Sequence, residues 1–225
     1  MSHPETSHRL PSAATRAAIL LRIRTALQYT TAKPQEPADP AVFPAIPPND
    51  LLQRFATELA ALKGELLQAS TWAEAQAHLG RMAEESQFVR IVATPHPDIR
   101  QACGSVVART LTGDHDCGPN LAQADLGITP CDCLVARTGS IVLTSRSGFG
   151  RSLSVLPPAH LVVARRSQLV ADLSDAFRLL RSWHGAMWPS MMTIISGPSR
   201  TADIEKILVL GAHGPRKLMV LLLNF

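Results

Sequence analysis

The sequence has few aromatic residues, no long apolar run and no regular cysteine motif, and each absence excludes a class of protein. Aromatic residues make up 4% of the 225 residues. Nucleic-acid binding favours a basic face with interleaved aromatic side chains, so no nucleic-acid partner is expected. No apolar run approaches the roughly 18 residues that a membrane span needs. Because Met1–Glu5 also lacks the basic start of a secretory signal, we expect a cytoplasmic protein.

The cysteines do not follow a cluster-binding pattern. They are Cys103, Cys117, Cys131 and Cys133. Cys131 and Cys133 form C-x-C, whereas zinc and iron–sulfur sites use C-x-x-C. Disulfides are not expected in a cytoplasmic chain. Two interpretations stay open. The cysteines are small structural residues, or Cys117 acts as a metal ligand together with His115 and Asp116. We expect no metal site and see no cofactor motif in this chain.

The net charge of +4 lies mainly at the start of the chain. Residues 1–30 carry four arginines and one acidic residue, so residues 31–225 carry only +1. Residues 14–29 predict an amphipathic helix with Ile19, Ile23, Ala26 and Leu27 on one face. Six prolines between residues 33 and 48 predict an extended linker. We therefore expect an N-terminal arm over residues 1–48, docking on a neighbouring subunit or a partner protein, and a domain over residues 49–225.

The rest of the sequence alternates between strand and helix patterns, which predicts an α/β fold with a mostly parallel sheet and helices on both faces. The expected helices cover residues 52–66, 72–82, 97–111, 169–180 and 202–208. The expected strands cover residues 88–93, 134–136, 141–143, 160–164, 191–195 and 218–223. In the helix over 169–180, we expect Leu169, Leu173, Phe177 and Leu180 to point inward.

One loop stands out as a candidate anion site. Ser196-Gly197-Pro198-Ser199-Arg200-Thr201 lies between a predicted strand and the predicted helix that starts at Ala202. A helix N-terminus offers free backbone N–H groups and a positive dipole end, and an arginine suits a carboxylate or phosphate. The alternative is that a hydroxyl only caps the helix and Arg200 points to solvent.

Three further polar turns are candidates for the same site, since ligands bind beyond the carboxyl ends of strands in open α/β sheets. Thr138-Gly139-Ser140 is either a pocket wall or an ordinary β-turn. The segment from Arg151 to His160 carries a histidine that is either a general base or a structural residue. The turn Gly211–Arg216 has His213 at its tip, facing the pocket or simply part of a loop.

These segments occur in an order that resembles the lactate utilization protein C family, also called the LUD domain. The resemblance covers about residues 85–225 and is strongest near the C-terminus. The matching segments are Ala124–Thr129, Thr138–Leu143, Leu156–His160, Ile195–Glu205 and Leu210–Pro215.

The resemblance implies a fold like that of glucosamine-6-phosphate deaminase, ribose-5-phosphate isomerase and the CoA transferases. It also implies a part in bacterial oxidation of L-lactate to pyruvate, with two iron–sulfur partner proteins. Because this chain has neither an iron–sulfur cysteine run nor a G-x-G-x-x-G motif, we expect the electrons to leave through another protein or through a cofactor that the sequence does not reveal. The proton-accepting candidates are His160 and His213. The candidates for binding a small carboxylate are Thr138, Gly139, Ser140, Arg151, Ser196, Gly197, Ser199, Arg200 and Thr201.

Two other functions stay open. One is a transferase, isomerase or ligase acting on a phosphorylated or CoA-linked metabolite, which the implied fold also hosts. The CoA transferases use a glutamate in a glycine-rich turn, and the corresponding turn Arg137–Ser140 has no carboxylate. The other is a non-catalytic subunit that binds a metabolite or assembles a complex through its basic arm. Assembly into a homo-oligomer is a further open alternative.

Overall fold

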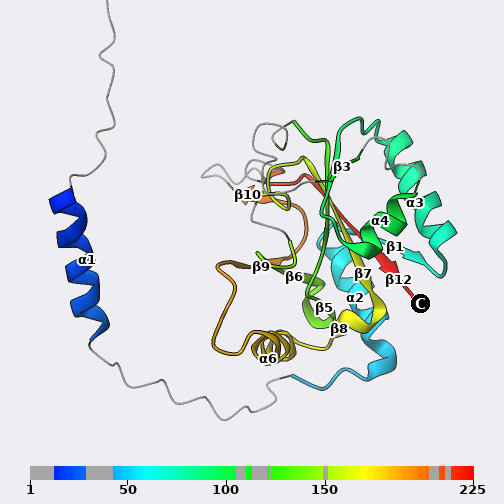
Figure 1. The fold of residues 1–225 in the computed structure, drawn as a ribbon. Coiled ribbons are helices and arrows are strands. Elements are labelled where there is room, and N and C mark those ends of the chain that lie inside the picture. The colour runs from blue at the N-terminus through cyan, green and yellow to red at the C-terminus, as the bar shows by residue number, and fades with distance from the viewer. Residues whose placement is uncertain are drawn as a thin grey trace, which may run out of the picture. The chain divides into compact units, whose positions relative to one another are not determined.

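A computed structural model describes residues 13–28, 43–104, 110–112, 121, 123–148, 152–202, 208–210 and 214–225 (Figure 1). The chain divides into two compact units, residues 1–43 and residues 44–225. In the first unit, helix α1 (Ala13–Leu27) forms as expected and buries none of its residues. At about 100° per residue, Ile19, Ile23, Ala26 and Leu27 do share one face, but the predicted amphipathic pattern is wrong. Arg16 falls on that face between Ile23 and Leu27, and Leu21 lies almost opposite Ile19.

Six parallel strands form the main sheet of the second unit. They are β1 (Glu65–Ala69), β2 (Ile91–Ala93), β3 (Thr110–Thr112), β4 (Leu126–Pro130), β7 (Ala159–Arg165) and β12 (Lys217–Leu223). Their order across the sheet is β1-β12-β7-β4-β2-β3. The central strands are buried at nearly every position, as expected for a parallel sheet covered on both faces. The predicted fold class is confirmed.

Helices cover both faces of this sheet because strand side chains alternate between them. On one face, α3 (Trp72–Glu85) and α4 (Pro97–Cys103) pack against residues such as Leu161 and Leu221. On the other face, α2 (Leu51–Ala61), preceded by the 3₁₀ turn η1 (Pro48–Asp50), packs Phe55 against residues such as Val162 and Val220. Each face thus has a separate apolar core.

A smaller sheet of order β8-β5-β6-β9 packs on the α2 side. Its strands are β5 (Cys133–Val135), β6 (Ser140–Thr144), β8 (Leu169–Val170) and β9 (Met192–Ile195). Strands β5 and β6 are antiparallel and joined through the 3₁₀ turn η3 (Ala136–Thr138), which confirms the predicted pair around a tight turn. Helix α6 (Leu173–His184) covers the other face with Ala176 and Leu180 (Figure 1).

Two predicted helices end earlier than expected, in each case at a residue with positive φ. Helix α2 stops at Ala61 because Lys63 adopts φ 68°, so Leu66 belongs to strand β1 instead. Helix α4 stops at Cys103, where Gly104 has φ 46°. Glycine is the residue that most readily ends a helix in this way. The Lys63-Gly64 pair and Gly104 were the available sequence signals.

The predicted helix over residues 169–180 starts late. Leu169 lies in β8, and α6 begins only at Leu173. Asp172 caps the helix: its side chain accepts from the Leu173 amide at 2.6 Å, while Asp175 accepts from the Asp172 amide at 3.0 Å. Phe177, expected to point inward, is 41% exposed.

The predicted helix over residues 202–208 is wrong at both of its ends. Strands β10 (Arg200–Ala202) and β11 (Leu208–Leu210) form an antiparallel pair in which Ala202 faces Leu208. Strand β4, in contrast, was not predicted, because Gly127 and Pro130 weaken its strand pattern. The hairpin pairing of β10 with β11 makes the first segment a strand, and the parallel neighbours β2 and β7, which are distant in sequence, make β4 a strand.

We expect Thr71→Ala to lower the free energy of unfolding by about 1 kcal/mol. The Thr71 hydroxyl accepts from the Glu74 amide at 3.2 Å and so caps α3, and the Glu74 carboxylate accepts from the amide of Ser70, the residue before the cap, at 2.7 Å. Urea unfolding measures the loss. The matched control is Thr57→Ala, inside α2 and exposed, which should not destabilise the protein because alanine favours helix interiors.

Candidate functional site

The turn at Thr138–Ser140 lies against helix α2. Gly139 adopts φ 59°, and a Cβ atom there would lie 2.6 Å from the backbone carbonyl carbon of Glu58, so only glycine fits. The turn directs the Ser140 hydroxyl to that of Ser196, and the two oxygens are 2.7 Å apart. Two segments that are distant in sequence therefore meet on the carboxyl half of α2.

The loop after β9 uses the end of α2 as its support. Gly197 has φ 86°, and a Cβ atom there would lie 2.6 Å from the Leu62 carbonyl oxygen. Arg200 donates a hydrogen bond to that same oxygen. A helix C-terminus carries a partial negative charge, so the Arg200 guanidinium complements it. Ser196 and Arg200 are exposed, which leaves further donors facing solvent.

The two remaining turns join this cluster through backbone hydrogen bonds. The Ser199 amide donates to the Pro215 carbonyl at 2.8 Å, and the Arg216 amide donates to the Pro158 carbonyl at 2.7 Å. Pro158 and Arg216 directly precede β7 and β12. The turns therefore meet at the amino edge of the main sheet, whereas we expected the carboxyl edge. The parallel pairing of β7 with β12 places both strand starts there.

His160 is buried two residues after Pro158, as the second residue of β7. Its side chain is 0% exposed, and its Nε2 lies 2.8 Å from the Thr129 hydroxyl on neighbouring strand β4. Burial lowers the pKa of His160 to about 4, because a charged imidazole loses its hydration there. Its Nδ1 has no hydrogen-bond partner among the described residues. His160 is thus neutral at neutral pH, with one ring nitrogen unused.

The other predicted site residues are placed as follows. Thr138 is half-buried, and its hydroxyl has no partner among the residues that the structure covers. The backbone of Thr201 pairs with Val209 in the β10–β11 ladder. Arg151 and His213 lie outside the described residues, as do His115, Asp116 and Cys117.

A second polar group, which the sequence analysis missed, occupies the carboxyl edge of the main sheet. Arg165 at the end of β7 donates two hydrogen bonds to Asp98, at 2.7 and 2.6 Å. The Thr94 hydroxyl after β2 is buried and has no partner within the described ranges. The signal was present: a buried strand followed by Thr94-Pro95-His96-Pro97-Asp98. The Arg165 guanidinium at this edge is held in place by the Asp98 carboxylate, so its charge is already paired within the protein.

The described cysteines are protonated thiols at neutral pH. Burial raises the pKa of Cys103 to about 11 and, with the charge of Asp132, that of Cys133 to about 12. Burial, with Cys133 and Asp132 adding to it, also raises the pKa of Cys131. Metal ligation needs the thiolate. Within the described ranges, no three His, Cys, Asp or Glu side chains gather as a metal site.

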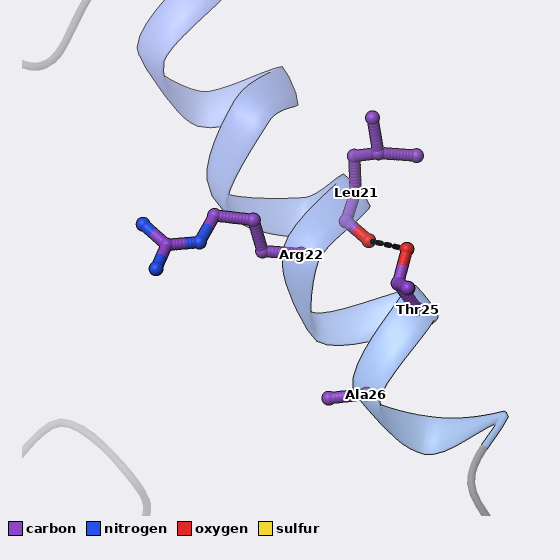
Figure 2. Close-up of a pocket in the computed structure, with 4 residues that line it drawn as sticks. All are labelled: Leu21, Arg22, Thr25 and Ala26. Carbon is purple, nitrogen blue, oxygen red and sulfur yellow. Dashed lines mark hydrogen bonds between the residues drawn. The ribbon is translucent and has the colours of Figure 1, made fainter.

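Helix α1 carries a shallow hollow lined by Leu21, Arg22, Thr25 and Ala26 (Figure 2). The Thr25 hydroxyl donates to the Leu21 carbonyl at 3.0 Å, so it is already satisfied within the helix. Figure 2 shows Leu21 and Arg22 pointing away from each other. This surface has no convergent polar groups. In the part of the chain that the structure describes, no helix is long and apolar enough to cross a membrane.

Comparisons with known proteins give one consistent result. Residues 52–223 match the family model of the LUD domain. The chain is 44% identical over 108 residues to lactate utilization protein C of Halalkalibacterium halodurans, covering 45% of this chain and 47% of that protein. It is 32% identical over 184 residues to the uncharacterized protein YkgG of Escherichia coli, covering 78% and 79%. Thus the chain spans about half the length of the lactate utilization protein it matches, and most of YkgG.

The fold has a counterpart among solved structures. A DUF162 family protein from Deinococcus radiodurans superposes with a TM-score of 0.58 at 21% identity, covering 80% of this chain and 99% of the other. At that identity the likeness concerns the fold alone.

Proposed function

The chain belongs to the LUD domain family, and from that premise we propose that it is a subunit of a bacterial L-lactate utilization system. In this proposal it takes part in the oxidation of L-lactate to pyruvate, and iron–sulfur partner proteins receive the electrons. Relatives named lactate utilization protein C, with 44% identity over 108 residues in one case, support the role.

The observation that carries the proposal is the convergence of four turns at the amino edge of the main sheet. Ser140 and Ser196 place two hydroxyls 2.7 Å apart. Arg200 comes from the same loop as Ser196 and is exposed, so its remaining N–H groups are available to a carboxylate. We propose that these three side chains bind the lactate carboxylate. Arg151 and His213 are proposed to complete the site.

Oxidation of lactate to pyruvate releases two electrons and two protons. In the proposed site, His160 accepts the proton of the lactate hydroxyl, because its imidazole is neutral. A bound carboxylate nearby raises the pKa of a buried histidine, so substrate binding itself makes His160 a better base. Thr129 holds the ring through Nε2, which leaves Nδ1 for the proton. The two electrons pass to the iron–sulfur partners, and His213, the other proton-accepting candidate, takes the proton released from the lactate Cα.

The test is dye-linked L-lactate oxidation by the chain mixed with its purified iron–sulfur subunits. We expect activity in the mixture and a loss of kcat in His160→Gln of on the order of 100-fold or more, the usual contribution of a general base. Binding of the subunits should be unchanged in that variant. Absence of activity in the complete mixture contradicts the proposed function. Full activity of His160→Gln removes only the role of the histidine.

A second variant tests the carboxylate site. Arg200→Ala should raise KM for L-lactate by on the order of 10- to 100-fold, since a hydrogen bond to a charged group contributes about 1.5–3 kcal/mol. Arg166→Ala, exposed after β7 at the opposite edge of the sheet, is the matched control and should leave KM unchanged. A lower melting temperature of Arg200→Ala with an unchanged KM would assign Arg200 to closing α2 instead.

A further inference from the structure

Three buried polar side chains, Thr94, Thr129 and His160, form a row on one face of the main sheet. In the parallel ladder of β2 and β4, Ala93 lies opposite Ile128. The ladder continues by one step, since the Thr94 amide donates to the Ile128 carbonyl at 3.0 Å, so Thr94 and Thr129 are neighbours. Their predecessors Ala93 and Ile128 point into the core under α3 and α4, so this pair points to the opposite face, because strand side chains alternate. The row ends at His160, whose Nε2 lies 2.8 Å from Thr129 Oγ1.

Both ends of this polar row are buried and lack a hydrogen-bond partner. Thr94 is 1% exposed and His160 is 0% exposed, and neither Thr94 Oγ1 nor His160 Nδ1 has a partner among the described residues. An unsatisfied buried polar group destabilises a protein, and valine would fill the Thr94 position without that loss. Valines do occupy neighbouring positions of the same face, Val92 on β2 and Val162 on β7. The polar row therefore indicates a function, because packing alone favours apolar residues here.

The hydrogen positions in the polar row follow from the role of His160 in the proposed function. With Nδ1 free for the substrate proton, Nε2 carries the ring hydrogen and donates it to the Thr129 hydroxyl oxygen. The hydroxyl hydrogen of Thr129 then needs another acceptor, and within the described ranges this hydroxyl bonds to no second residue. Neighbouring strands lie about 4.8 Å apart, a spacing that one water molecule bridges with two hydrogen bonds of about 2.8 Å. A water between Thr129 and Thr94 thus provides both hydroxyls with a partner.

Thr94 brings the polar row to the carboxyl edge of the main sheet. It directly follows β2, and the next two residues, Pro95 and His96, are only half-buried. We propose that Thr129, the bridging water and Thr94 form a proton path from His160 to solvent at this edge. The path is a property of this chain, whereas its use during turnover rests on the proposed function.

Each step of the path moves one proton and leaves the hydroxyls unchanged. After His160 has accepted the lactate hydroxyl proton at Nδ1, it gives the hydrogen on Nε2 to Thr129. Thr129 passes its own hydrogen to the water, the water passes one to Thr94, and Thr94 releases its own to solvent. His160 is then neutral with its hydrogen on Nδ1. Once pyruvate leaves, water in the emptied site takes that hydrogen while the path returns one to Nε2.

The first test measures how fast the ring hydrogen of His160 exchanges with solvent, by NMR of the full chain labelled in its histidine nitrogens. Loss of one signal in His160→Gln identifies it. Thr94→Val keeps the shape of threonine without its hydroxyl, and it should slow this exchange on the order of 10-fold, because the hydrogen then escapes only when the sheet opens. The backbone amides of β7 report that opening and should be unaffected. Thr94→Ser, the matched control, keeps the hydroxyl and should exchange as fast as the unaltered chain.

The second test measures turnover in the mixture with the iron–sulfur subunits. Thr94→Val should lower kcat by about 10-fold with KM unchanged, and Thr94→Ser should restore it. Ring exchange that is as fast in Thr94→Val as in the unaltered chain, or as slow in Thr94→Ser as in Thr94→Val, overturns the path. Slower exchange with an unchanged kcat overturns its use in turnover. If the mixture of unaltered proteins is inactive while Thr94→Val slows the exchange, the proposed function fails and the path stands.

Discussion

Acidification from about pH 7.5 to about pH 4.5 should cost the unaltered protein about 2.5 kcal/mol of unfolding free energy more than it costs His160→Gln. Burial lowers the pKa of His160 from 6.5 to about 4 in the folded protein. Between these values the unfolded chain binds a proton that the folded chain does not. The stabilising effect is therefore complete above about pH 6.5 and is lost as the pH falls through the folded pKa of about 4.

Urea unfolding at both pH values measures this difference. Glutamine is neutral throughout and still reaches the Thr129 hydroxyl, so His160→Gln removes the titration with little change of shape. Thr129→Val is the control. It leaves His160 Nε2 without its partner and should cost about 1–3 kcal/mol at every pH, with the same pH dependence as the unaltered protein. Parallel pH curves for the unaltered protein and His160→Gln would contradict a buried neutral imidazole.

Gly139→Ala should lower the free energy of unfolding by about 2–4 kcal/mol. About 1 kcal/mol comes from forcing a side chain into the left-handed region, where Gly139 has φ 59°. The rest comes from overpacking against a backbone, since the new Cβ would lie 2.6 Å from the Glu58 carbonyl carbon. Displacement of the turn also moves Ser140 away from Ser196, so KM for L-lactate should rise.

Two other glycines separate the causes. Gly185 has φ 54° and ψ −122°, outside the left-handed helical region, and open space around its Cβ position, so Gly185→Ala should cost about 1–3 kcal/mol from backbone strain alone. Gly80 lies inside α3 with nothing within 4 Å, so Gly80→Ala should stabilise by about 0.5–1 kcal/mol. Thermal or urea unfolding of the three variants gives the order. A Gly139→Ala protein that loses only about 1 kcal/mol, the cost of the left-handed region alone, would show that the turn shifts freely on α2.

Some features of the site followed from sequence because they depend on local chemistry. The start of α3 after the N-cap Thr71, the apolar strands β7 and β12, and the tight turn between β5 and β6 are each set by neighbours within a few residues. The polar turns and their order along the chain were also visible in the sequence, and they indicated the LUD domain family. These patterns predicted an α/β domain in which Ser140 and Ser196 belong to one site.

What the tertiary structure decided depends on residues far apart in the chain. The parallel register of β7 with β12 moved the converging turns to the amino edge of the sheet. Arg200, which by its type alone suits an anion, also found the carbonyl end of α2, 138 residues away. Local sequence thus determined which polar turns the chain carries, and long-range strand pairing and helix packing decided where they meet.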